Sequence, residues 1–383
     1  MRILYIYSEL TIKGGADRVI AEKANYLAEH GYQVTIVTES QMGRELAFPL
    51  HPAIKHLDLG LDFDQQYTQK FMRRAYTYFS LIRKYKRCLR EVLEQEKPDI
   101  TITTLGRSID FISEMNDSSV KIGEAHSTRA HLRNFYMMDG RGFIYRCVAR
   151  YMKWRTYRRI SKLEALVLLT KDDADTWTEV QHTYVIPNSI PFYPQESAKL
   201  DNKQVIMVGR YNNAKGYNYM IRAWAVVHLN HPDWKLHVYG SGELQNEVVQ
   251  WIKECHLEDT IILNEPTSNI LEKYLDSSIC AMSSRNEGFP MVLLEAMACG
   301  VPCVSFDCPH GPRNIIRNEE DGLLVEYLNP QALAESICRL IEDEQLRKHL
   351  GKNARKNIQR FSKDTVMKQW EDLFDNLTKN HRK

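Results

Sequence analysis

Two glutamates, Glu287 and Glu295, stand eight residues apart on either side of a mostly apolar segment. Pro290 lies between them, at a position where the first turn of a helix tolerates proline. The residues from Met291 to Cys299 are apolar and end at Gly300, a pattern that predicts a buried helix. Glu287 is therefore expected on the loop before this helix, and Glu295 about one turn inside it.

The start of this predicted helix is suited to binding an anion, because the first backbone amides of a helix lack intrahelical acceptors. A carboxylate beside a bound phosphate can hold the hydroxyls of a sugar. The amides at this helix start belong to Gly288, Phe289, Met291 and Val292. Together these groups predict a site for a sugar nucleotide. The alternative is a solvated helix start with an ordinary glutamate.

Two basic residues form a second group of candidate ligands. The predicted strand Val205 to Val208 leads into Gly209 and Arg210, and Lys215 precedes a helix that begins near Tyr217. A guanidinium forms forked hydrogen bonds with phosphate, and an ammonium adds a point charge. Both cations are expected to project from the sheet edge toward a diphosphate. The alternative is that they are solvated surface side chains.

Three more candidates lie in the first half of the chain. Gly14 and Gly15 separate the first predicted strand from a helix that begins near Asp17, and glycine lets a backbone approach phosphate or sugar closely. The residues that follow do not complete a dinucleotide fingerprint, so we expect no nicotinamide cofactor. His126 follows another predicted strand. A single histidine is also consistent with a structural role.

The segment SSRNEGFPMVLLEAMACGVPCVSFD, which contains both glutamates, resembles the signature of retaining glycosyltransferases of family 4, which have the GT-B fold. The Gly-Phe-Pro between the glutamates and the Glu-Ala-Met-Ala-Cys-Gly that begins at the second one also match. The resemblance covers nearly the whole chain and is strongest from Val205 to Val325. It implies a GT-B architecture: two Rossmann-like domains that face each other across a central cleft, with a C-terminal helix that returns to the first domain.

The resemblance also implies roles for the charged candidates. Arg210 and Lys215 match the residues that bind the diphosphate in this family. Glu295 matches the glutamate that holds the ribose hydroxyls. Glu287 matches the one that orients the donor sugar and stabilises positive charge at its anomeric carbon. Glu287 is not expected to be a covalent nucleophile, because in this family the acceptor is thought to attack the front face of the sugar.

The remaining family positions are less specific. His126 matches a histidine that lines the cleft near the donor sugar, and Pro266 matches the loop that receives the base. The family needs no metal, and we expect none here. Asp62 and Asp64 imitate the metal-binding Asp-x-Asp of another glycosyltransferase fold but lack its sequence setting.

Strands and helices alternate along the chain, which predicts parallel α/β domains. A length of 383 residues favours two such domains. We expect an acceptor-side domain at 1–188 together with a returning helix at 362–383, and a nucleotide-sugar domain at 189–361. The predicted strands are Ile3–Tyr7, Val34–Thr38, Ile100–Thr103, Val120–Gly123, Leu166–Leu169, Val205–Val208, Lys235–Tyr239, Thr260–Leu263, Ile279–Met282, Cys303–Phe306 and Leu323–Val325.

Composition limits where the protein works and which partners it has. The formal net charge is +2, and eight cysteines are scattered without a Cys-x-x-Cys pair. They are expected to be free thiols in a reducing cytosol. The N-terminus has the pattern of a core strand rather than that of a signal peptide, and no apolar run is long enough to span a bilayer.

Two stretches, 65–90 and 140–163, are basic and aromatic and contain no acidic residue. Anionic lipid headgroups would attract such a surface, and the aromatic side chains would lie at the interface. We expect peripheral binding to the inner face of the cell membrane and no nucleic acid, although an RNA-binding surface or an ordinary solvated face would use similar residues. The cations chosen as the membrane or acceptor surface are Arg83, Lys84, Lys86, Arg87, Arg155, Arg158 and Arg159.

These observations favour a retaining transferase that moves a hexose or N-acetylhexosamine from a nucleoside-diphosphate sugar, expected to be a UDP-sugar. The acceptor would be a hydroxyl of a glycan or lipid-linked intermediate in surface polysaccharide or glycolipid synthesis. One alternative is a sugar-nucleotide epimerase of the same fold. The other is an inert protein that binds a sugar nucleotide or lipid.

Overall fold

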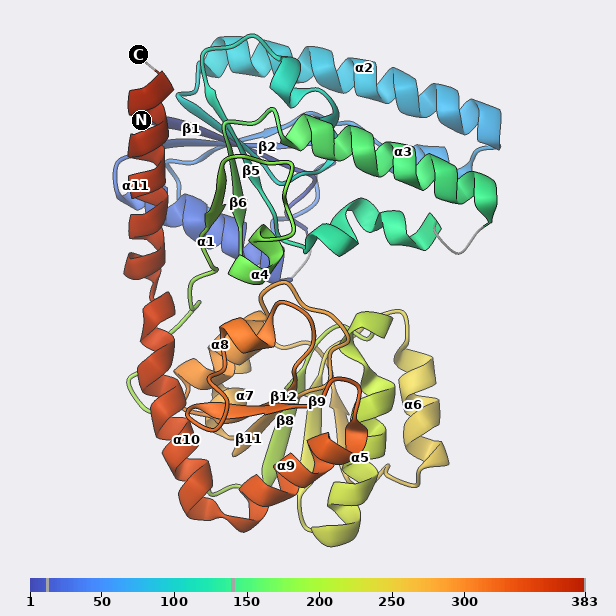
Figure 1. Cartoon of the computed structure of the whole chain (residues 1–383), viewed down its shortest axis with the longest axis vertical. Helices are drawn as coiled ribbons and strands as arrows, with labels where there is room; N and C mark the ends of the chain where they lie inside the picture. The colour runs from blue at the N-terminus through green and yellow to red at the C-terminus, as the bar shows by residue number, and fades with distance from the viewer. Residues whose placement is uncertain (12–13, 139–141, 382–383) are drawn as a thin grey trace. The chain divides into compact units, whose positions relative to one another are not determined.

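The structure is a computed structural model that describes residues 1–11, 14–138 and 142–381. Residues 140 and 141 of the second basic stretch lie outside the described part. The chain divides into two compact units (Figure 1). Unit 1 contains Met1–Ile186 and Met367–Lys383, and unit 2 contains Pro187–Val366. The sequence predicted these boundaries at 188/189 and 361/362.

Unit 1 is built on a seven-stranded parallel sheet with the order β3-β2-β1-β4-β5-β6-β7. Strands β4, β5 and β6 are buried along their whole length, as expected for a parallel sheet that is covered on both faces. The strands are β1 Arg2–Tyr7, β2 Gln33–Thr38, β3 Lys55–Asp58, β4 Ile100–Thr103, β5 Val120–Glu124, β6 Ala165–Leu168 and β7 Thr183–Val185.

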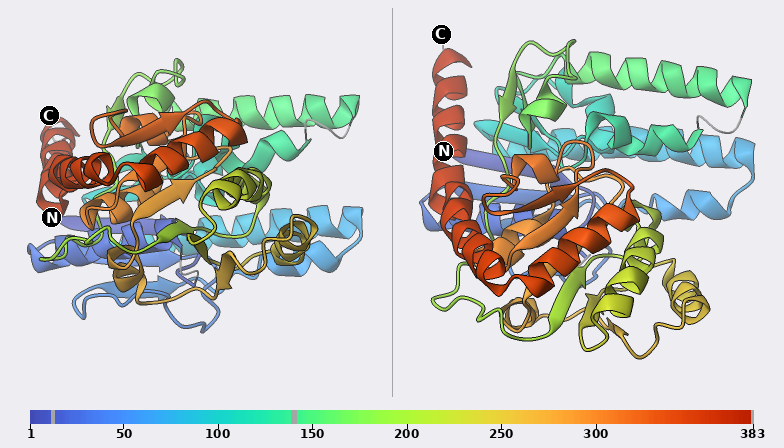
Figure 2. Two further views of the ribbon diagram at one scale, coloured as in Figure 1. Left: turned by 90° about the horizontal axis from the view of Figure 1, so that it is seen from below. Right: turned by 60° about the horizontal axis from the view of Figure 1, so that its bottom comes forward.

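Alternate residues of β1 point to opposite faces of this sheet. Leu4 and Ile6 share a core cluster with Tyr85 of α2, and Lys23 of α1 lies over the ring of Tyr5. Helices α2 and α3 both extend beyond the sheet on the same side (Figures 1 and 2). The helices are α1 Gly15–Glu29, α2 Phe71–Glu96, α3 Phe143–Ile160, α4 Lys171–Ala174 and α11 Lys363–His381, with 3₁₀ segments η1 Asp64–Thr68, η2 Arg107–Asp110, η3 Ile112–Glu114 and η4 Arg129–Met138.

Unit 2 contains a six-stranded parallel sheet with the order β10-β9-β8-β11-β12-β13. Helices α5, α6 and α9 contribute to one core cluster with the strands, and α7 and α8 pack against each other. The strands are β8 Gln204–Val208, β9 Lys235–Tyr239, β10 Ile261–Asn264, β11 Ile279–Met282, β12 Cys303–Phe306 and β13 Gly322–Val325. The helices are α5 Tyr217–Asn230, α6 Gln245–Glu254, α7 Ile270–Leu275, α8 Met291–Ala298, α9 Pro330–Glu342 and α10 Glu344–Asn357, with η5 Asn213–Lys215, η6 Pro312–Asn314 and η7 Ile358–Phe361.

The predicted fold class is confirmed, including the C-terminal helix that returns to unit 1. Trp370 of α11 is buried and lies over the ammonium group of Lys23. The sequence did not predict β3 and β7. Both are edge strands, and neither contains a fully buried residue. They therefore lack the apolar run that marks the central strands.

The order of strands reverses once in each sheet. From β8 the chain proceeds through β9 and β10 on one side, and from β11 through β12 and β13 on the other. Strands β8 and β11 are therefore neighbours whose following loops leave the sheet in opposite directions, and such a switch point is where open α/β sheets bind ligands. In unit 1 the corresponding neighbours are β1 and β4.

Candidate active site

An ion pair joins the loops that follow β8 and β11 in unit 2. The Nζ atom of Lys215 lies 2.6 Å from Oε1 of Glu287, and the two side chains are 21% and 12% exposed. The Oγ atom of Ser284 donates to the same oxygen at 2.7 Å. The predicted Lys and Glu thus meet at the switch point, with both charges partly accessible to solvent.

Glycine at two positions lets these loops approach each other. Gly216 has a φ of +63°, and a Cβ atom there would lie 2.2 Å from the carbonyl oxygen of Ser283. A side chain is therefore excluded. At Gly209, a Cβ atom would meet the stem of Lys215 at 3.3 Å. The Lys215 side chain therefore passes over Gly209, where no side chain blocks it, and reaches Glu287.

A third loop supports Glu287 from the other side. The backbones of Glu287 and His310 form an isolated parallel bridge. A Cβ atom at Gly311 would lie 2.7 Å from Pro290 and 2.8 Å from the Cβ atom of Glu287. The loop after β12 thus packs tightly against the segment before α8, which fixes the backbone that carries the carboxylate.

Helix α8 begins at Met291, with Pro290 as its N-cap in an extended conformation, close to the predicted start. The amide of Leu293 bonds back to the Pro290 carbonyl at 3.1 Å. Gly288, Phe289, Met291 and Val292 thus surround the helix start as predicted. The Phe289 ring, however, is buried and packs edge-on against Phe361, so Phe289 can offer a ligand only its backbone.

Glu295 lies inside α8 and is 7% exposed. The hydroxyl of Tyr274, from α7, donates to its Oε2 at 2.9 Å. Burial and the neighbouring Glu295 carboxylate raise the pKa of Tyr274 well above its ordinary value, so the phenol remains a donor. Tyr274 therefore holds the carboxylate in one orientation at the helix start.

Arg210 does not join Lys215 at the pair. It is 62% exposed, and among the described side chains its Nε contacts Glu243 at 3.4 Å. The sequence correctly placed Arg210 after β8, but the expectation that both cations converge is not met in this structure. Pro266 is exposed on the loop that follows β10.

The histidine predicted in unit 1 belongs to a buried charged cluster. The Nε2 atom of His126 lies 3.3 Å from Oε1 of Glu124, the last residue of β5. Lys23 of α1 donates to the same oxygen. Burial lowers the pKa of His126, the nearby Glu124 raises it and Lys23 lowers it, for a net decrease. The imidazole is therefore neutral near pH 7.

Gly14 and Gly15 lie at the start of α1, on the loop after β1. Gly14 is the extended N-cap, its carbonyl accepts from the amide of Arg18 at 3.1 Å, and Gly15 is the first helical residue. The predicted strand-to-helix turn is therefore present at the β1–β4 switch point of unit 1.

The basic stretches form α2 and α3, which expose many aromatic rings; Tyr76 is 75% exposed and Phe143 is 74% exposed. Two of the predicted surface cations have a carboxylate partner from outside the stretches. Glu114 lies 3.7 Å from Lys86 and 2.9 Å from Arg159. In the folded protein, an acidic residue from another segment therefore lies beside cations of both stretches. The other predicted cations, Arg83, Lys84, Arg87, Arg155 and Arg158, are exposed.

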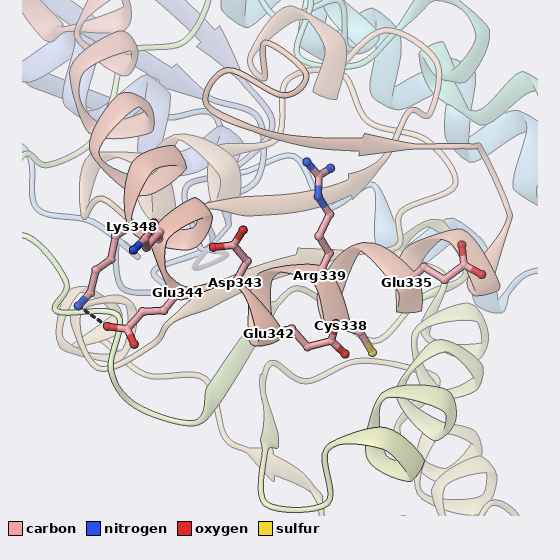
Figure 3. Close-up of a pocket in the computed structure, with 8 residues that line it drawn as sticks. Glu335, Cys338, Arg339, Glu342, Asp343, Glu344 and Lys348 are labelled. Atoms are coloured by element: carbon pink, nitrogen blue, oxygen red, sulfur yellow. Dashed lines mark hydrogen bonds and ion pairs between the residues drawn. The ribbon is translucent and has the colours of Figure 1, made fainter.

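A surface pocket of about 980 Å³ lies elsewhere on unit 2, along α9 and α10 (Figure 3). Its charged groups already have partners: Arg339 makes a forked pair with Glu319, and Lys348 pairs with Glu344. It contains none of the predicted ligands, so it is not the candidate active site.

Within the described residues, no group of three or more His, Cys, Asp or Glu side chains could hold a metal ion. Asp62 instead accepts backbone hydrogen bonds from Asp64 and Gln65 at the start of η1. The eight cysteines are free thiols. Among the described helices, none is both long and apolar enough to cross a membrane.

Sequence reasoning missed several residues of these sites. Lys23 stands on the buried face of α1 with Ile20 and Leu27, where an apolar side chain is the norm, so a lysine in an apolar stripe was an available signal. Glu124 precedes His126 by two residues, a spacing that keeps both on one face of an extended chain. Nothing in the sequence connects Tyr274 with Glu295.

Comparison with known proteins agrees with this architecture. Residues 189–357 match the family model described as glycosyl transferases group 1. The amylovoran biosynthesis glycosyltransferase AmsD of Erwinia amylovora is 27% identical over 385 residues, which cover 98% of this chain and 99% of AmsD. The exopolysaccharide phosphotransferase SCO2592 of Streptomyces coelicolor is 37% identical over 228 residues, or 57% of this chain, but this chain spans only 24% of that relative.

A solved structure of TarM from S. aureus, in complex with fondaparinux, α-GlcNAc-glycerol and UDP, superposes with a TM-score of 0.78 at 17% identity. The match covers 97% of this chain and 99% of TarM. These comparisons support a glycosyltransferase. The chain has the GT-B fold of these solved structures, and residues 189–357 are similar to the glycosyl transferases group 1 family.

Proposed function

We propose that this protein is a retaining glycosyltransferase of family 4 that moves a hexose or N-acetylhexosamine from a UDP-sugar to a hydroxyl group. The observation that carries the proposal is the Lys215–Glu287 pair, which joins the ends of β8 and β11 beside the start of α8. A cation and a helix start favour a diphosphate, and an adjacent carboxylate favours the sugar attached to it.

The charges of this site match the charges that develop during transfer. As the glycosidic bond breaks, negative charge grows on the departing diphosphate, where Lys215 and the amides at the start of α8 stabilise it. Positive charge grows at the anomeric carbon, where Glu287 stabilises it. When the diphosphate binds, Lys215 exchanges its partner from Glu287 to phosphate or shares both, and its stem lies along Gly209, where no side chain restricts it. Arg210, which is exposed on the loop after β8, adds a second cation when the diphosphate binds.

The relatives support this substrate class. TarM was crystallised with UDP and an α-GlcNAc-glycerol, and AmsD is named for the biosynthesis of a polysaccharide, amylovoran. By extension, the donor here is a uridine diphosphate sugar and the acceptor is a glycan or lipid-linked intermediate of a surface polymer. The phosphotransferase relative suggests a different transferred group. The mass of the product therefore discriminates between the two activities.

We also propose that the protein binds to an anionic membrane at its cytoplasmic face, where a lipid-linked acceptor is found. The α2 and α3 helices expose aromatic side chains beside cations, a combination that suits the interface of a charged bilayer. Each cation near such a surface contributes about 1 kcal/mol, reduced by salt. A lipid-linked acceptor would then be concentrated next to unit 1. The exposed aromatic residues are Tyr76, Phe79, Phe143, Tyr145, Tyr151 and Trp154.

The test is transfer from a panel of radiolabelled UDP- and GDP-sugars to a membrane lipid extract, with the product characterised by mass and by the NMR coupling of its anomeric proton. A sugar added with α configuration supports the proposal. Glu287→Gln should lower turnover about 100- to 1000-fold, the usual effect of losing one preorganised charge contact. Glu319→Gln removes a carboxylate from a surface pair of the same unit and should leave turnover unchanged.

Four outcomes would reject the proposal. One is turnover of Glu287→Gln above about a tenth of the wild-type value. Another is a product whose added mass is that of a sugar phosphate. The third is interconversion of the sugar nucleotide without an acceptor, which would identify an epimerase. Binding of UDP without any turnover would instead point to an inert sugar-nucleotide-binding protein.

A further inference from the structure

The charged cluster in unit 1 joins three elements that are distant in sequence. Oε1 of Glu124 accepts a hydrogen bond from the ammonium group of Lys23 and lies 3.3 Å from Nε2 of His126, a buried atom without a hydrogen-bond partner among the described residues. The ring centroid of Trp370 lies 3.8 Å from Nζ of Lys23. Lys23 and Glu124 are 5% and 2% exposed, whereas the His126 side chain is 13% exposed. Only the histidine therefore has appreciable access to solvent and ligands.

A buried ion pair of this kind is costly, because taking two charges out of water costs several kcal/mol per ion. The aromatic rings around Lys23 reduce that cost through cation–π contact; Tyr5 lies 5.6 Å from the ammonium in addition to Trp370. Oε2 of Glu124 has no hydrogen-bond partner among the described residues. One oxygen of this buried carboxylate is therefore held by Lys23, and the other has no described partner.

On the basis of the proposed glycosyl transfer, we propose that Glu124 is a positioning residue for His126. Lys23 keeps Glu124 ionised and opposes protonation of the imidazole to its charged form. The negative charge of the carboxylate, 3.3 Å from Nε2, favours a proton on that nitrogen, which leaves Nδ1 as an acceptor. A neutral imidazole with a fixed tautomer can accept a hydrogen bond from a sugar hydroxyl. Lys23, Glu124 and Trp370 thus act through His126 and do not touch the substrate.

The electrostatics of the cluster support this assignment. Burial raises the pKa of the Glu124 carboxyl, but the charges of Lys23 and His126 outweigh burial and hold that pKa below its usual value. The charged groups that face His126 are Glu124, from β5, and Lys23, from α1; the hydroxyl of Tyr7, on β1, is held by Asp17 at 2.7 Å. Removing one member of the Lys–Glu pair should therefore shift the titration of His126 in a direction that depends on which charge is lost.

The experiment follows the His126 imidazole in full-length protein by ¹⁵N NMR, with the signal assigned by its loss in His126→Gln. In the wild type, His126 should titrate below its ordinary pKa and carry its neutral proton on Nε2. Lys23→Met removes a repelling charge and should raise the pKa by about 1 unit. Glu124→Gln removes the nearer, attracting charge and should lower it further.

Activity supplies the second measurement. If neutral His126 is required, the acid limb of kcat/KM should move to higher pH in Lys23→Met by the same amount as the NMR titration. Glu124→Gln should move it the other way and lower kcat about 10- to 100-fold, as is usual for a residue that orients a functional histidine. A merely structural ion pair would lower stability in both variants and shift the imidazole titration through its charge, but would leave the acid limb of kcat/KM where it is in the wild type.

Lys121→Met is the matched control. Lys121 is also on β5, is 6% exposed and pairs with Asp117 at 2.5 Å, so this variant breaks a comparable buried pair without touching the cluster. Its His126 titration should match the wild type. If Lys23→Met does not fold, Glu124→Asp withdraws the carboxylate by one methylene and keeps Lys23, so it should lower the pKa of His126 as Glu124→Gln does, but to a smaller extent.

Two results would overturn the proposal. One is a wild-type His126 with its neutral proton on Nδ1. The other is a shift of the same sign in Lys23→Met and Glu124→Gln. Neither depends on enzyme activity, so they are distinguishable from failure of the proposed transfer. An active enzyme with an unresponsive His126 rejects the positioning role alone, and an inactive protein with the predicted titrations rejects the transfer alone.

Discussion

Replacing Lys215 by Met should weaken the binding of UDP about 10- to 100-fold and leave the binding of uridine unchanged. Lys215 is 21% exposed, and its Nζ lies 2.6 Å from Oε1 of Glu287. A hydrogen bond to a charged group contributes about 1.5–3 kcal/mol, and every 1.4 kcal/mol is a factor of ten in affinity. Because the proposed contact of Lys215 is with the diphosphate, the affinity for a ligand without phosphate should not change.

Isothermal titration calorimetry with UDP and with uridine measures both affinities at one salt concentration. Lys203→Met is the control. Lys203 lies immediately before β8 and forms an exposed pair with Asp233, so this variant also removes one lysine from an ion pair. Gly209→Ala probes the same contact indirectly, since its methyl group would press on the Lys215 stem at 3.3 Å. It should cause a smaller loss of UDP affinity than Lys215→Met.

Two results would refute this reasoning. The first is an unchanged UDP affinity in a natively folded Lys215→Met protein, which would show that Lys215 only neutralises Glu287. The second is an equal loss for UDP and uridine, which would mean that the variant disturbs the loops after β8 and β11 rather than a phosphate contact. Thermal unfolding of each variant identifies a general loss of structure.

Three other predictions concern metal, membrane and pH. Treatment with EDTA should leave transfer unchanged, whereas loss of activity that manganese restores would contradict the cation-based account of leaving-group stabilisation. Replacing Arg83, Lys84 and Arg87 by Glu should release the protein from anionic vesicles in a sedimentation assay, while Lys86→Gln, whose ammonium already has a carboxylate partner, should have little effect; binding that does not depend on lipid charge would argue against a membrane surface. Glu39 follows β2, is 3% exposed and pairs with Arg107 at 2.9 Å. Burial raises the pKa of its carboxyl more than Arg107 lowers it, so the contribution of Glu39 to stability is greatest below the unfolded pKa of about 4.3 and declines as pH rises toward the folded value. Glu39→Gln should remove that decline in urea unfolding between pH 4 and 7, and an unchanged slope would show that other groups cause it.

The sequence predicted the central strands and the segments that carry the site, because both have strong local signals. Buried parallel strands appear as continuous apolar runs, and β9, β11 and β12 have the predicted bounds. The glycines at 209 and 216 mark loops that must approach other backbones. The edge strands β3 and β7 have no such pattern, because their side chains are only partly covered.

Pairings between distant residues could not be predicted in the same way. The sequence identifies Arg210 and Lys215 as neighbours of one strand end, but not that Lys215 turns to Glu287 while Arg210 turns to Glu243. Similarly, the acid-free stretches of α2 and α3 suggested seven equivalent cations, yet Glu114 pairs with two of them. A side chain's partner depends on rotamers and on loops from elsewhere in the chain.

The same kind of ion pair occurs in both units, and its exposure determines what it can do. In unit 2, Lys215 and Glu287 are 72 residues apart and partly exposed, so an incoming phosphate or sugar can compete for either charge. In unit 1, Lys23 and Glu124 are 101 residues apart and almost completely buried, so no ligand can exchange with them. Charges that cannot reach a substrate can still set the proton of a more exposed neighbour. His126 is the more exposed member of that cluster, and the buried pair can therefore influence transfer only through the protonation and orientation of its imidazole.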